Sequence, residues 1–166
     1  NSLNTYMLSA IVVQKSGMSL TEFLKKHLKV DRKLKVVCDF ANAMGSYEIA
    51  SVREFFDIIP MYEELDGTFP NHEANPLKLD TLDDICAKVK EVGADFGAAF
   101  DGDADRCGFI DNEGEIIQMD LFTALIAQDI LADSPAGTAI LYDLRSSKSV
   151  RECIAENGGK PIMSRV

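Results

Sequence analysis

Paired cysteines and long apolar runs are both missing from this sequence. The four cysteines are far apart and surrounded by apolar neighbours, which favours buried, reduced thiols over disulfides or a zinc site. No apolar stretch approaches the roughly 18 residues of a membrane span, and the first residues lack a basic region followed by an apolar signal segment. We therefore expect a cytoplasmic protein with no membrane partner. The cysteines are Cys38, Cys86, Cys107 and Cys153.

Positive charge is also scarce, since 17 Lys and Arg residues face 27 Asp and Glu residues for a net charge of −10. Nucleic-acid binding is disfavoured, because no basic stripe with interleaved aromatic residues offsets that charge. The net charge does not exclude a local anion site, because four basic residues fall near predicted strand or loop ends. These are Arg106, Arg145, Lys148 and Arg165.

The residues that are present predict an α/β protein. A hydrophobic content of 46% in 166 residues is enough to build one domain and part of another. In the first half, apolar spacing predicts helices over 3–13, 20–28 and 47–56, and strands over 34–40 and 58–62, the second interrupted by Pro60. A further helix is expected to begin at Thr81 as its N-cap and to end at Gly93.

The second half continues the same alternation of strands and helices. A strand over 95–100 leads into Asp101, and residues 111–114 form a hairpin turn between strands 107–110 and 115–118. Later elements are a helix over 121–132, a strand over 139–142, a helix over 148–157 and a strand over 161–163. We place a domain boundary at about residues 118–120.

The segment that follows the strand over 95–100 has three aspartates at alternate positions. Asp101, Asp103 and Asp105 converge on one turn, where their charges repel one another unless a cation lies between them. An EF-hand calcium loop would need Gly at the sixth position and Glu at the twelfth, where this chain has Arg106 and Asn112. The pattern predicts a divalent metal site at the carboxyl end of a strand.

Two other functions fit this loop. In a haloacid-dehalogenase-like phosphatase, Asp101 would be the nucleophile and Asp103 the general acid or base. In a non-catalytic metal-binding module, the same carboxylates would hold an ion without any chemistry.

The chain resembles the α-D-phosphohexomutases, the phosphoglucomutase and phosphomannomutase family. Residues 100–106 (Phe-Asp-Gly-Asp-Ala-Asp-Arg) are similar to that family's metal-binding loop, and residues 66–76, which include Phe69-Pro70-Asn71-His72, are similar to the segment upstream of it. Residues 34–42 resemble the opening strand and turn of the family's second domain. Residues 142–147 resemble a strand end in its third domain.

The resemblance implies a fold and a domain plan. Residues 1–118 would form domain II, a three-layer α/β/α domain with a mixed sheet, and residues 119–166 the N-terminal part of domain III, a second similar α/β domain. Domains I and IV of the same parent chain would then be missing partners. Because the family's phosphorylated serine lies in domain I, the isolated fragment is expected to be inactive.

The resemblance also implies roles for individual residues. Asp101, Asp103 and Asp105 would bind Mg²⁺, and Arg106 would hold a phosphate group of a phosphosugar substrate. Arg145 stands where the family often has lysine, and arginine stays protonated near neutral pH, so we expect charge stabilisation from it rather than proton transfer. Arg165 and His72 are further candidates for binding the phosphosugar. The resemblance also implies that His72 supports the metal loop or the active-site region, and the alternative for this residue is a surface or locally hydrogen-bonded histidine. The implied reaction interconverts hexose 1-phosphate and hexose 6-phosphate, of mannose or glucose, through a phosphoserine and a bisphosphate intermediate.

Overall fold

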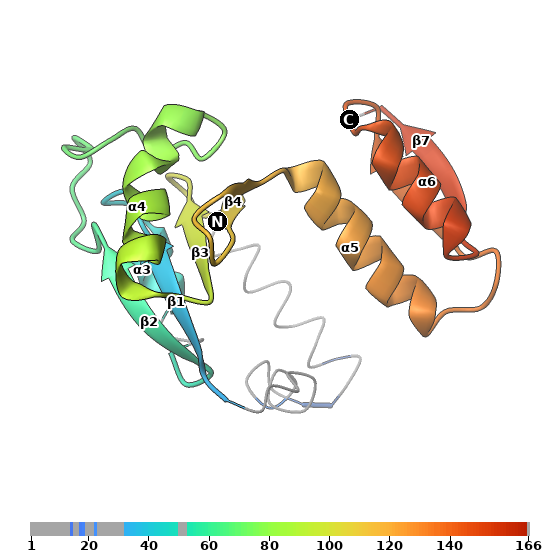
Figure 1. Cartoon of the computed structure of the whole chain (residues 1–166), viewed down its shortest axis with the longest axis horizontal. Helices are drawn as coiled ribbons and strands as arrows, with labels where there is room; N and C mark the ends of the chain where they lie inside the picture. The colour runs from blue at the N-terminus through green and yellow to red at the C-terminus, as the bar shows by residue number, and fades with distance from the viewer. Residues whose placement is uncertain (1–13, 15–16, 19–21, 23–31, 50–52, 166) are drawn as a thin grey trace. The chain divides into compact units, whose positions relative to one another are not determined.

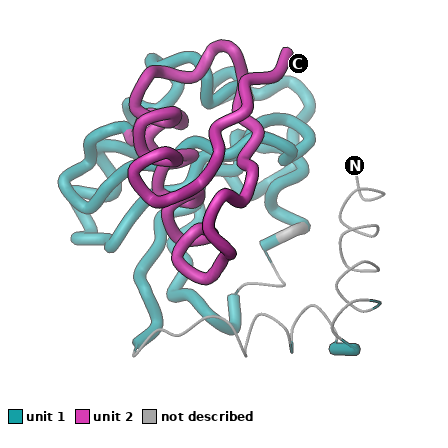
Figure 2. Tube along the Cα trace, turned by 90° about the vertical axis from the view of Figure 1, so that its right-hand side faces the viewer, with its two compact units in different colours: residues 1–116 teal, residues 117–166 magenta. Residues whose placement is uncertain are grey.

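The structure, a computed structural model, describes residues 14, 17–18, 22, 32–49 and 53–165 (Figure 1). The helices predicted over 3–13 and 20–28 lie outside the described residues, apart from position 22. The chain divides into two compact units, residues 1–116 and residues 117–166, which Figure 2 shows in different colours. The boundary expected at residues 118–120 lies just after this division. Each unit is described by itself below.

A mixed five-stranded sheet forms the centre of the first unit, with the strand order β2-β1-β3-β4-β5. β1 pairs in parallel with both β2 and β3, whereas β3 and β4 are antiparallel. Asp39 at the end of β1 lies opposite Ala99 in β3, so the side chains that follow the two strands gather at one sheet edge. The predicted α/β class with a mixed sheet is confirmed. The strands are β1 (Leu34–Asp39), β2 (Phe56–Met61), β3 (Phe96–Phe100), β4 (Cys107–Ile110) and β5 (Ile116–Ile117).

Apolar clusters cover the two faces of this sheet. On one face, Val37 and Ile110 pack with Ile85 and Val89 of helix α4 (Asp83–Val92). On the other face, the core is formed by Val36, Cys38, Phe40, Ile49 and Ala98. Successive strand residues point to opposite faces, which is why β1 contributes to both clusters.

Helix α4 is held tightly against β3. A Cβ atom at Gly97 would lie 2.9 Å from Val89 Cγ2 and 3.2 Å from Ile85 Cδ1, so no larger residue fits there without movement. The helix ends at Gly93, whose φ of 59° is the left-handed conformation that glycine adopts readily, and this predicted end is confirmed. β3 therefore starts at a defined point and carries Asp101 to the sheet edge.

Three predicted local features are wrong. Helix α3 spans only Gly45–Glu48, residues 53–55 form a turn, and Phe56 begins β2 opposite Leu34 instead of ending a helix. Pro60 does not interrupt β2, because an edge strand has one unpaired side that tolerates a missing N–H.

Thr81 is the third. It lies inside the 3₁₀ helix η2 (Leu79–Leu82), and its hydroxyl donates to the carbonyls of Asn75 (2.9 Å) and Lys78 (2.7 Å) rather than capping α4.

The second unit contains two helices and a two-stranded parallel sheet. Its core lies between the helices and the sheet and is formed by Ala124, Ala127, Leu131, Tyr142, Val150 and Ile154. Among the described residues, no helix has both the length and the apolar character needed to cross a bilayer. The elements are α5 (Met119–Ala132), β6 (Ala139–Asp143), α6 (Lys148–Glu156) and β7 (Lys160–Ser164).

Candidate functional site

The three aspartates lie in a tight loop that connects β3 to the antiparallel strand β4. The loop is closed by a hydrogen bond from the Asp101 N–H to the Arg106 carbonyl (3.2 Å) and by one from the Ala104 N–H to the Asp101 carbonyl (3.1 Å). Ala104 has a φ of 59°, a conformation that is uncommon outside glycine and asparagine. This geometry turns alternate side chains toward the same side.

The carboxylates of Asp101, Asp103 and Asp105 form a compact acidic cluster. One oxygen of each lies within 4.8 Å of the other two, and Asp101 is buried while the other two are exposed. The charge of Asp103 raises the pKa of Asp105, with smaller contributions from burial and from Asp101. This repulsion is what a divalent cation would relieve, and hard carboxylate oxygens are the ligands that Mg²⁺ prefers. The residues present therefore fit the predicted ion.

Arg106 anchors the buried member of the cluster. Its backbone N–H donates to Asp101 Oδ1 (3.0 Å), its Nε donates to Asp101 Oδ2 (2.6 Å), and Nε lies 3.6 Å from Asp105 Oδ1. Burial alone would raise the pKa of Asp101, but these hydrogen bonds from Arg106 outweigh it and lower that pKa below its ordinary value. Asp101 thus stays ionised, and the Arg106 side chain remains 52% exposed beside the cluster.

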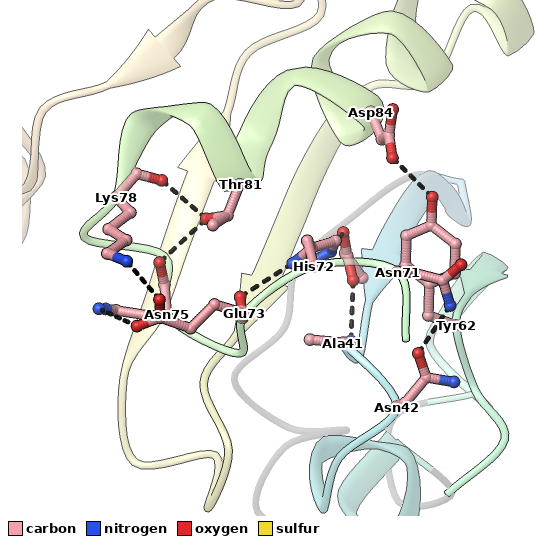
Figure 3. A network of polar contacts seen from close by, with 11 residues as sticks. Ala41, Asn42, Tyr62, Asn71, His72, Glu73, Asn75, Lys78, Thr81 and Asp84 are labelled. Atoms are coloured by element: carbon pink, nitrogen blue, oxygen red, sulfur yellow. Dashed lines mark hydrogen bonds and ion pairs between the residues drawn. The ribbon is translucent and has the colours of Figure 1, made fainter. Parts of the chain in front are cut away.

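A second buried carboxylate, that of Asp39, lies at the end of the neighbouring strand β1. Its Oδ1 accepts a hydrogen bond from the Ala41 N–H (2.8 Å), and its Oδ2 lies 3.0 Å from His72 Nε2. His72 Nδ1 lies 2.9 Å from the carbonyl oxygen of Glu73, as Figure 3 shows. Both ring nitrogens of His72, which the resemblance placed near the phosphosugar, therefore have partners in this unit.

Asparagine side chains tie the segment around His72 to the turn that follows β1. Asn71 Nδ2 donates to Asn42 Oδ1 (2.7 Å; Figure 3). Asn42 Nδ2 donates to the Glu64 carbonyl (2.8 Å). The ring of Tyr62 meets the His72 ring edge-on at 5.3 Å, and its hydroxyl donates to Asp84 Oδ2 (2.7 Å). Segments that are distant in the sequence thus form one polar network.

In the second unit, Arg145 and Arg165 line an open cavity of about 410 Å³ together with Asp143 and Leu144. The cavity lies at the carboxyl ends of the parallel strands β6 and β7, where α/β proteins commonly bind ligands. Arg145 Nη2 donates to Asp143 Oδ2 (2.7 Å), and this hydrogen bond raises the pKa of the guanidinium further. Arg145 is therefore a permanent positive charge at this edge.

The predicted site residues thus form three groups. The metal loop unites Asp101, Asp103, Asp105 and Arg106, the β6–β7 edge unites Arg145 and Arg165, and His72 pairs with Asp39 instead of joining either group. Sequence reasoning missed Asp39. A local signal for Asp39 was available, because Asp39 ends an apolar run just as Asp101 follows one. Its partner His72 lies 33 positions later, and no sequence pattern connects the two.

Residues 18–114 match the sequence profile described as "Phosphoglucomutase/phosphomannomutase, alpha/beta/alpha domain II". The chain is 40% identical over 142 residues to a phosphomannomutase/phosphoglucomutase of Pseudomonas syringae, covering 84% of this chain and 30% of that protein. It is 41% identical over 148 residues to a phosphomannomutase of Methanocaldococcus jannaschii, covering 87% of this chain and 32% of that protein. The chain therefore spans about a third of the length of these curated relatives.

A solved structure gives the same match in three dimensions. A phosphoglucomutase/phosphomannomutase family protein from Burkholderia thailandensis superimposes with a TM-score of 0.81 at 30% identity. The match covers 93% of this chain and 33% of that one, so it includes parts of both compact units.

Proposed function

Because the chain belongs to the phosphoglucomutase/phosphomannomutase family, we propose that it is a segment of a cytoplasmic phosphohexomutase. The parent enzyme would interconvert the 1-phosphate and 6-phosphate of mannose or glucose. The observation that carries the proposal is the cluster of three convergent carboxylates with Arg106 beside it, at the carboxyl end of β3. The remaining parts of the enzyme, including a phosphorylated serine, would lie in domains outside this chain.

In this proposal Asp101, Asp103 and Asp105 hold Mg²⁺. When bound, the ion would offset negative charge on the transferring phosphoryl group. The structure supports such a role by the charge balance of the loop, where three carboxylates face a single guanidinium. A divalent cation would bring this local net charge of about −2 close to zero.

Arg106 would bind a phosphate oxygen while keeping the loop in shape. Its Nε and backbone N–H are engaged by Asp101, and its guanidinium is half-exposed at the mouth of the loop. Arginine suits this task because its planar fork presents several N–H donors to a phosphate group and remains charged. A lysine at this position would lack the fork that contacts Asp101 and the phosphate together.

Arg145 and Arg165 would bind the anionic substrate at the β6–β7 edge. Arg145 stays protonated, and hydrogen bonds to the Asp143 carboxylate orient it. It would therefore stabilise charge on a phosphate oxygen and would not exchange protons. The general acid and base of the reaction are then expected elsewhere in the parent enzyme.

The proposed reaction proceeds in two transfers. A hydroxyl oxygen of the hexose phosphate attacks the phosphoserine phosphorus and gives its proton to the general base, the serine oxygen leaves and takes up a proton from the general acid, and a hexose bisphosphate forms. After the bisphosphate reorients, the serine oxygen loses its proton and attacks the phosphorus of the other phosphate. The hexose oxygen of that phosphate leaves and is protonated, which restores the phosphoserine and releases the isomer. Arg106 would stabilise charge on the phosphoryl oxygens in both transfers.

The phosphatase alternative asks Asp101 to act as a nucleophile. That interpretation leaves Asp105 and Arg106 without a role, whereas in the mutase proposal Asp105 completes the set of metal ligands and Arg106 binds phosphate. The curated relatives are also named as mutases, which favours the mutase.

The test uses the full-length protein with its serine phosphorylated. With Mg²⁺ and glucose 1-phosphate or mannose 1-phosphate, phosphorus NMR should show conversion to the 6-phosphate. Asp103→Asn should reduce that rate by about 100-fold or more, because it removes a charged ligand without changing the volume of the side chain. Asp111→Asn, in the hairpin turn after β4, is the matched control and should retain activity. Release of inorganic phosphate would favour the phosphatase, and an unchanged spectrum with both sugars would exclude the mutase.

A further inference from the structure

The buried pair Asp39–His72 has a geometry that requires a proton between its partners. The carbonyl oxygen of Glu73 can only accept, so the hydrogen bond at His72 Nδ1 needs a proton on Nδ1. Nε2 then faces Asp39 Oδ2 at 3.0 Å, and this contact also needs a proton, on either atom. Loss of the shared proton breaks one of the two contacts whichever tautomer the imidazole adopts.

The environment of the pair favours keeping this proton. Asp39 and Asp84 are the charged groups that act on the imidazole, and both are negative. The carboxylate of Asp84 accepts a hydrogen bond from the hydroxyl of Tyr62, whose ring packs against the His72 ring. Burial opposes a charge on the imidazole, but the hydrogen bond to the Glu73 carbonyl, together with the hydrogen bond and charge of Asp39 and the charge of Asp84, outweighs it and raises the pKa of His72.

Asp39 also controls the turn formed by residues 40–44. Ala41, which donates its N–H to Asp39, and Asn42 have φ values of 47° and 57°, two consecutive left-handed residues that are not glycine. Such conformations persist only where the surroundings hold them, and here Asp39, Glu64 and Asn71 supply the hydrogen bonds.

This turn touches the metal loop and the strand that leads into it. The Met44 N–H donates to the Gly102 carbonyl (3.3 Å), within the Asp101–Asp105 segment. The ring of Phe40 stacks on that of Phe100, with the ring centroids 5.7 Å apart. Phe100 directly precedes Asp101. A Cβ atom at Gly45 would lie 3.1 Å from Phe100 Cβ, so the two segments are in close contact.

We infer that Asp39 and His72 are positioning residues for the metal loop, which they hold through the turn of residues 40–44. Neither residue touches the proposed ion. They keep the left-handed turn in place, and the turn fixes the Gly102 carbonyl and with it the spacing of the carboxylates on either side. This inference rests on the proposed Mg²⁺ site.

The test measures Mg²⁺ affinity of the full-length protein by calorimetry between pH 6 and pH 9. We expect affinity to fall by about tenfold as the pair loses its proton, a typical cost of disturbing groups behind metal ligands. His72→Ala should show the lower affinity at every pH. Asp39→Asn is the matched variant, because its amide can accept from Ala41 and donate to a neutral His72 Nε2, so affinity should stay high and lose its pH dependence.

A second readout needs no metal. In metal-free protein, the amide resonances of Met44 and Gly102 should shift with the same pH midpoint as His72, and Asp39→Asn should abolish that shift. Asp84→Asn, which keeps an acceptor for Tyr62 but removes a negative charge, should move the midpoint to lower pH.

The outcomes separate the two proposals. One outcome is that neither the wild type nor any variant binds Mg²⁺, while the amide resonances of Met44 and Gly102 still shift with the pH midpoint of His72. The proposed metal site is then wrong, and the coupling between the Asp39–His72 pair and the loop stands. If affinity and amide shifts are the same in wild type, His72→Ala and Asp39→Asn at every pH, the positioning role is wrong.

Discussion

At the scale of single residues, the chain uses one arrangement twice. Asp39 and Asp101 are fully buried carboxylates at the ends of adjacent parallel strands, and each accepts a backbone N–H and contacts one basic side chain. Burying an unpartnered carboxylate is costly, so such groups are retained only with partners. Among the described residues, no buried side-chain nitrogen or oxygen lacks a hydrogen-bond partner.

The His72–Asp39 contact makes the stability of the first unit depend on pH. The pKa of His72 is raised above its ordinary value of 6.5 in the folded chain. The stability that this contact contributes is therefore complete below pH 6.5 and is lost as the pH rises through the raised pKa of His72. Asp39, whose pKa burial also raises, changes stability in the same direction.

We expect the free energy of unfolding to fall by about 1 kcal/mol from pH 6 to pH 9, the usual value of one hydrogen bond. Urea unfolding at a series of pH values measures this, and Asp39→Asn should flatten the profile. Stability that rises over this range would contradict the assignment of the proton to the pair.

At the scale of elements, strand β3 determines where the metal loop begins. Its small residues Gly97 and Ala99 lie on the face that packs against helix α4 and let the helix approach closely. The approach is tightest at Gly97, where an added Cβ would meet Val89 Cγ2 at 2.9 Å. Close packing here fixes the position of the strand that ends in Asp101.

Gly97→Ala should therefore destabilise the first unit by about 1–3 kcal/mol, because the added methyl group forces α4 away from the sheet. Gly67→Ala is the control, since a Cβ at Gly67 meets nothing within 4 Å, and it should change stability by less than about 0.5 kcal/mol. Equal urea midpoints for the two variants would show that the helix adjusts freely.

Elements with strong local signals could be predicted from the sequence. The apolar run 96–100 before Asp101, the C-cap at Gly93 and the turn at Asp111–Gly114 depend on neighbours in sequence, and all three appear. Thr81 was misassigned because its hydroxyl finds carbonyl acceptors six and three residues earlier. The Asp39–His72 pair depends on tertiary structure, so no local pattern reveals it.

At the scale of the whole molecule, the candidate residues are divided between two units with separate cores. The carboxylate cluster belongs to residues 1–116, and the cavity lined by Arg145 and Arg165 belongs to residues 117–166. The relatives are about three times as long as the matched region. In the proposed function, other domains of the parent enzyme would supply the rest of the catalytic machinery.

We therefore expect the 166-residue chain to show no conversion of glucose 1-phosphate or mannose 1-phosphate with Mg²⁺, because the proposed reaction places the phosphoryl donor in a domain outside this chain. Phosphorus NMR with the full-length protein as the positive control tests this. Turnover by the chain alone would mean that the donor lies within these residues.

Pro60 has a further consequence at this scale. It lies exposed in β2, the edge strand of the five-stranded sheet, three positions after Asp57, the exposed charged residue of the same strand. A strand from another molecule that approached this edge would find a missing N–H donor and a carboxylate in its way. The edge that ends the sheet is thus protected against intermolecular strand pairing, the first step of β-aggregation.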